Sequence, residues 1–91
     1  MSLETFKALL EREIAANEHK GPWEDWQPSA DRALRELQIH QEKLRAALTN
    51  GGREAISEHC ADLALIACKI HERFGAPALE PSTLQHAALA S

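Results

Sequence analysis

The sequence lacks features that would assign it to several large functional classes. No apolar run approaches the roughly 20 residues that a membrane-spanning helix requires. The chain does not open with a basic segment followed by an apolar one, as a secretory signal does. Basic residues are not in excess, because the formal charge is −4 with the two signs interspersed. We therefore expect a cytoplasmic protein that binds neither a membrane nor a nucleic acid polymer.

Cysteine is also scarce, with two residues in the chain. Cys60 and Cys68 are separated by more than two turns of one predicted helix, which is too far for a disulfide bond. We expect them to be small buried residues in a reducing compartment. At 91 residues the chain forms one domain, and a chain this short buries only about 60 to 65% of its unfolded surface. A homodimer or a dimer of dimers is therefore expected.

The chain does contain helical periodicity, most clearly between Ile56 and Phe74. Apolar residues recur there in alternating steps of four and three, the spacing of one face of an α-helix. This stripe consists of Ile56, Cys60, Leu63, Ala67, Ile70 and Phe74. The opposite side of its middle section is also apolar, which predicts the central helix of a bundle. Asp62 lies in that section and needs a charged partner, a metal or a raised pKa, because burying a lone carboxylate costs several kcal/mol.

Two further amphipathic helices precede this segment. The first is expected from about Leu3 to Asn17 with Ser2 as its cap, and the second from about Ala30 to Thr49, followed by an Asn-Gly-Gly turn. The fold class is thus all-α, an antiparallel helical bundle completed by dimerisation, with residues 1–77 as the helical domain and residues 78–91 as a tail.

The tail contains one further helix signal. The sequence from Ser82 to Gln85 has the spacing of a capping box, which predicts a short C-terminal helix from about Thr83 to Ala90. Its alanine-rich, weakly amphipathic composition equally favours a frayed end.

The segment from His19 to Pro28 interrupts the helical pattern and contains both tryptophans. In one interpretation Trp23 and Trp26 close an end of the bundle, since indole rings bury large areas. In the other they form a wall that stacks on a ligand, with Lys20 available for phosphate.

A polar layer interrupts the apolar face of the second helix. Glu36, His40 and Lys43 project along one edge of that face. The short glycine turn makes the second and third helices antiparallel, so His40 should come level with His59 and Asp62. We expect these side chains to form either surface ion pairs or a site.

The order of these segments along the chain resembles that of a known family. A helix, a KGxW loop, a helix ending in KLRAAL, a glycine turn and a helix with HCADLALIA occur in that order between Leu10 and Gly75. This arrangement is similar to the MazG-like all-α nucleoside triphosphate pyrophosphohydrolases, particularly their small single-domain, phage-type members. Such proteins typically have E-x-x-E before L-x-x-A-L on one helix and E-x-x-D with a following Asn on the next, and these residues bind Mg²⁺.

The resemblance assigns positions to the polar layer. His40 and Lys43 stand where the family has its first glutamate pair, and His59 and Asp62 stand at the second acidic pair. Leu65 stands at the asparagine, so only Asp62 is unchanged. Mg²⁺ requires oxygen ligands, and a protonated amine is never a ligand.

Three explanations remain open for this departure. The protein retains the fold without the chemistry, or its histidines bind a softer metal, or Glu36, Glu42 and Glu58 supply the missing oxygens. The third is disfavoured because two of these carboxylates lie one residue from the matched positions, about 100° around the helix.

The implied function is a diverged nucleotide pyrophosphohydrolase that converts an NTP to NMP and pyrophosphate. His40, His59 and Asp62 would hold the metal, with Glu36 beside them in the catalytic layer. Lys43 and Lys20 would contact phosphate, and Trp23 or Trp26 would stack on the base of a bound nucleotide. The alternative is a catalytically inactive helical interaction module that dimerises and retains the fold.

Overall fold

The computed structural model describes residues 2–76, which form three α-helices and no strand. α1 spans Leu3–Ala16, α2 spans Ala30–Asn50 and α3 spans Arg53–Phe74, and two short 3₁₀ turns, Glu18–Lys20 and Trp23–Asp25, connect α1 to α2. The all-α prediction is confirmed for this part of the chain. The helix predicted from about Thr83 to Ala90 lies outside the described residues.

α1 and α2 each begin directly after a capping serine and end within one residue of the predicted positions. The side chain of Ser2 accepts a hydrogen bond from the backbone N–H of Thr5, and the side chain of Ser29 accepts one from Arg32. At the end of α2, a Cβ on Gly51 would lie 2.8 Å from the backbone of Ala47. Only glycine fits there, which explains the tight connection from α2 to α3.

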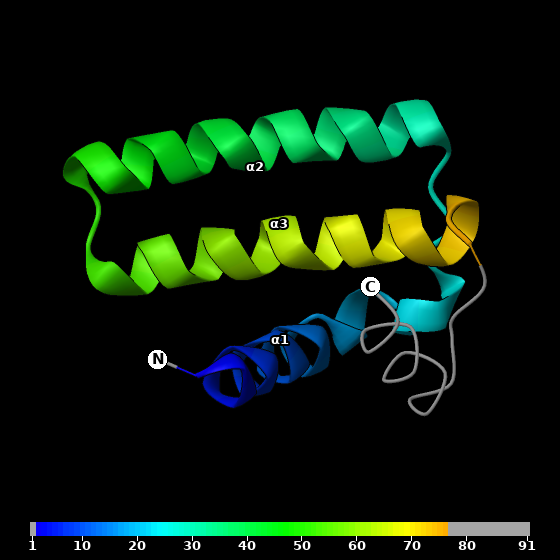
Figure 1. The fold of residues 1–91 in the computed structure, drawn as a ribbon, viewed down its shortest axis with the longest axis horizontal. Coiled ribbons are helices and arrows are strands. Elements are labelled where there is room, and N and C mark those ends of the chain that lie inside the picture. Colours follow the sequence, from blue (N-terminus) through cyan, green and yellow to red (C-terminus); the bar gives the residue numbers. More distant parts are fainter. Residues whose placement is uncertain (1, 77–91) are drawn as a thin grey trace, which may run out of the picture.

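α3 is the central helix, as predicted. It runs antiparallel beside α2, and α1 packs against it on the side away from α2, inclined to the other two helices (Figure 1). None of the three helices combines the length and the apolar character that crossing a membrane requires.

The core within the described chain is small, and it is not the predicted stripe. Its buried hydrophobic residues are Ala33, Ala47, Ala61 and Ile66. The stripe from Ile56 to Phe74 is half-buried at best, and Ala67 and Phe74 are exposed. The single chain leaves this stripe partly uncovered, because the buried residues of α3, Ala61, Ile66 and Lys69, lie on another face of the helix.

The cysteines also differ from the prediction. Both are free, Cys60 is half-buried and Cys68 is exposed. Cys68 lies on a side of α3 that neither α1 nor α2 covers, so it is not the buried residue that its apolar surroundings in the sequence suggested.

Candidate functional site

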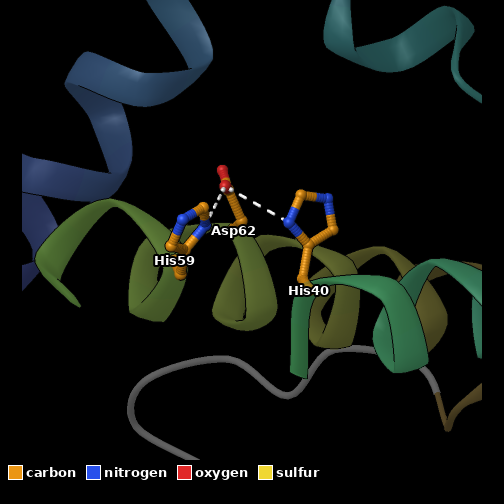
Figure 2. A group of neighbouring side chains, drawn as sticks. All are labelled: His40, His59 and Asp62. Carbon is orange, nitrogen blue, oxygen red and sulfur yellow. Dashed lines mark ion pairs between the residues drawn. The ribbon is translucent and has the colours of Figure 1, made fainter. Parts of the chain in front are cut away.

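His40, His59 and Asp62 converge between α2 and α3 (Figure 2). The oxygen Oδ2 of Asp62 lies 3.4 Å from Nδ1 of His40 and 3.6 Å from Nδ1 of His59. One ligand atom from each residue lies within 4.8 Å of the other two. The glycine turn and the shared rise of two antiparallel helices bring them level, as predicted. All three side chains are only 19 to 20% exposed.

These distances fit a shared ion better than they fit hydrogen bonds. Neither contact has the geometry of a hydrogen bond, because both Nδ1 atoms are buried and have no hydrogen-bond partner within residues 2–76. Two ligand atoms that each lie about 2.0 to 2.2 Å from a tetrahedral Zn²⁺ are about 3.3 to 3.6 Å apart. Three protein ligands with a fourth position open is the pattern of catalytic zinc sites.

A second carboxylate lies behind His40. Oε2 of Glu36 is 3.9 Å from Nε2 of His40, the ring nitrogen that faces away from Asp62. Metal-binding histidines commonly donate their other ring N–H to a carboxylate, but at 3.9 Å Glu36 lies beyond hydrogen-bond distance of Nε2. Glu36 also pairs with Arg32 at 3.2 Å, so its side chain is held on this edge of α2.

The three residues face an open pocket of about 850 Å³. Its walls come from α1, α2, α3 and the segment that connects α1 to α2. This volume lies in the range of small-molecule sites. The pocket lining includes the residues assigned from the sequence to the metal, the phosphates and the base: Lys20, Trp23, Trp26, Glu36, His40, Lys43, His59 and Asp62. Glu42 lies outside this lining. Lys20 and Lys43 are exposed, so both ammonium groups are available to an anionic ligand.

α1 contributes a carboxylate that the sequence did not reveal. Glu13 lines the same pocket together with Glu58. Burial raises the pKa of Glu13, and the negative charges of Asp62 and Glu58 raise it further. Nothing in the periodicity of α1 marks Glu13, because its position depends on how α1 crosses α3.

The two tryptophans lie beside each other, between the pocket and the end of α3. The rings of Trp23 and Trp26 are in contact, with centroids 5.9 Å apart and planes inclined by 53°. Both line the pocket, and their segment also folds back onto the end of α3, where Arg73 donates a hydrogen bond to the carbonyl of Pro28. Gly21 has a φ of +124°, a conformation that favours glycine and allows this reversal.

Comparisons of the chain with protein-family models, with curated proteins and with solved structures give no match.

Proposed function

We propose that this chain is a metal-dependent hydrolase of the MazG-like type that cleaves a nucleoside triphosphate to the monophosphate and pyrophosphate. The proposal depends most on one observation, the two buried histidine Nδ1 atoms that have no hydrogen-bond partner within residues 2–76 and lie 3.4 and 3.6 Å from one oxygen of Asp62. Two imidazoles and one carboxylate favour Zn²⁺, Co²⁺ or a similar ion over Mg²⁺. A bound ion of this kind polarises phosphoryl oxygens and activates water.

The other pocket residues support binding of an anionic, aromatic ligand. Lys20 and Lys43 would contact the phosphate groups, because both line the pocket and are exposed. Trp23 and Trp26 would contact the base. Glu13 would accept the proton of the attacking water, since a carboxylate with a raised pKa is a stronger base than an ordinary one.

The charges in the pocket agree with this division of roles. Glu13, Glu36 and Glu58 lie on the same lining as the metal site, whereas the two lysines supply the positive charge that a polyphosphate requires. A ligand with several phosphates and a divalent cation would balance both sets of charges at once.

The test is a screen for pyrophosphate release from nucleoside triphosphates, with the protein loaded with Zn²⁺, Co²⁺, Mn²⁺ or Mg²⁺. We expect pyrophosphate release with a transition metal. His59→Ala should lower the rate of release by more than about 100-fold, because mutating even the residues that only contact metal ligands lowers metal affinity or activity 10- to 100-fold. His71→Ala is the matched control, since His71 is an exposed histidine of α3 outside the pocket lining. Release that depends on Mg²⁺ and is indifferent to His59→Ala would contradict the proposal.

We also propose that the chain acts as a homodimer. The face of the α2–α3 hairpin that points away from the pocket carries exposed apolar residues, among them Leu34 at 55%, Leu48 at 65% and Phe74 at 51%. Residues 34, 37, 41, 44 and 48 of α2 recur in steps of three and four, the spacing of a helix-packing seam. A second copy presents the same seam, and pairing the two would bury both.

This face also favours the second candidate function. A chain that dimerises through the hairpin without releasing pyrophosphate from any nucleotide would be an interaction module that retains the fold. Lys43 is consistent with that alternative, because it brings a positive charge to the pocket that contains the proposed metal site.

A further inference from the structure

A buried lysine fixes the aromatic wall of the pocket to α3. Lys69 is 2% exposed, although it lies outside the apolar stripe of α3, in the turn between Ile66 and Ile70. Burying an ammonium group costs several kcal/mol unless it is paired and hydrogen bonded. A lysine at this position therefore requires specific partners.

Trp23 and Glu72 provide these partners. Nζ of Lys69 donates a hydrogen bond of 2.9 Å to the carbonyl of Trp23 and pairs with Oε2 of Glu72 at 3.1 Å. It also lies 4.0 Å from the centroid of the Trp23 ring. An ammonium group has three N–H donors, and these contacts match that number. The ammonium thus holds both the backbone and the ring face of Trp23.

Glu72 completes the contact. Nε1 of Trp23 donates to Oε1 of Glu72 at 3.4 Å. The hydrogen bond from Lys69 lowers the pKa of the Glu72 carboxyl, with a smaller effect from Trp23. Arg73 on the same turn holds the carbonyl of Pro28. One edge of α3 therefore fixes residues 21–28 near both ends.

The same face of α3 holds the candidate metal ligands. Asp62, Ile66 and Lys69 follow each other in steps of four and three, which places Lys69 about 10 Å along the helix axis from Asp62. A single helix therefore sets the separation between the aromatic wall and the metal site.

We infer that Lys69 is a positioning residue that holds Trp23, and through it the wall of Trp23 and Trp26, beside the site of His40, His59 and Asp62. The wall then presents a preformed surface to a planar aromatic ring of the ligand. That the ligand is a nucleotide rests on the proposed function, whereas the fixation of Trp23 does not.

The test uses Lys69→Met, which removes the charge and keeps the volume. Replacing a buried ion with an apolar residue of similar size is often neutral or stabilising, so the melting temperature should stay at or above that of the wild type. In a Trp26→Phe background Trp23 is the single tryptophan, because the chain has two. We expect Lys69→Met in that background to shift the emission to longer wavelength and to increase quenching by acrylamide.

Ligand binding provides the second readout. With Trp26 intact, Lys69→Met should weaken binding of α,β-methylene-ATP by about tenfold, the equivalent of one contact of about 1.4 kcal/mol. The affinity for Co²⁺ should be unchanged, because Lys69 does not contact the metal ligands. Lys7→Met, an exposed lysine of α1, is the matched control and should change none of these quantities.

The outcomes are distinguishable. Unchanged emission and quenching of Trp23 in Lys69→Met would overturn the inference, and a lower melting temperature with unchanged quenching would leave Lys69 a merely structural role. If the variant does not fold, Glu72→Gln provides the same test, because Glu72 is exposed and contacts both Lys69 and Trp23. If α,β-methylene-ATP binds neither the wild type nor Lys69→Met, the proposed function fails. The quenching of Trp23 by acrylamide still decides the role of Lys69 in that case.

Discussion

Asp62 accepts no hydrogen bond from either histidine within the described residues, although one of its oxygens lies within 3.6 Å of both rings. A structural remnant of a lost site would be expected to close into direct hydrogen bonds, since a buried polar atom without a partner costs about 1 to 3 kcal/mol. The distances from Asp62 to the two ring nitrogens are instead those of ligands around an ion. This is the physical reason for preferring a metal site to a simple ion pair.

Glu13 provides a residue-level prediction with two readouts. The pKa of Glu13 is raised, so the ionised carboxylate is disfavoured in the folded chain. The ionised side chain therefore lowers the free energy of unfolding at neutral pH, and this loss disappears once acid protonates the carboxylate. Glu13→Gln should therefore stabilise the metal-free chain at pH 7 by a few tenths of a kcal/mol. The gain should vanish below the ordinary glutamate pKa of about 4.3.

Glu13→Gln should also lower turnover, by about 100-fold or more, if the carboxylate accepts a proton from water. Urea denaturation at pH 7 and pH 4, together with pyrophosphate release, measures both effects. Glu11→Gln is the control, because Glu11 is exposed on α1 and lies outside the pocket. A Glu13→Gln variant that is less stable at pH 7 would show that this carboxylate has a favourable partner.

At the scale of the helices, local signals predicted most of what the structure contains. Ser2 and Ser29 cap the starts of α1 and α2, and Gly51 and Gly52 form the tight turn from α2 to α3. That turn determines which residues of α2 and α3 come level. The juxtaposition of His40 with Asp62 followed from that alone. These features depend on backbone geometry within one hairpin, which a sequence pattern describes well.

The unpredicted features depend on contacts between segments far apart in the chain. Lys69 reads as a solvated lysine in the sequence, because its partner Trp23 precedes it by 46 residues. Glu13 reaches the pocket through the inclination of α1 on α3, which apolar periodicity does not specify. The exposure of Ala67 and Phe74 could not be predicted either. The periodicity shows that a face of the helix is apolar, but it does not show which neighbouring element covers that face.

At the scale of the whole molecule, the exposed apolar face of the α2–α3 hairpin predicts a dimer. Sedimentation velocity at micromolar concentration should show a species of twice the chain mass. Leu63→Glu should convert it to a monomer, because Leu63 belongs to the stripe on the uncovered side of α3 and is only half-buried in the single chain.

The control for the dimer is Glu11→Lys, which changes the charge of an exposed residue on α1. It should leave the sedimentation coefficient unchanged. A wild-type chain that sediments as a monomer at these concentrations would defeat the dimer and would also weaken the resemblance to the MazG-like proteins, because that family builds its sites from paired chains.

The most direct test of the metal site is a titration of the purified protein with Co²⁺, followed by its visible absorption. We expect one Co²⁺ per chain with the bands of a tetrahedral ion, weaker binding as the pH falls because protons compete for the imidazoles, and no binding in His40→Ala or His59→Ala. Cys68→Ser and His71→Ala should bind as the wild type does. No binding by the wild type, or binding that persists unchanged in His59→Ala, would contradict the metal site formed by His40, His59 and Asp62.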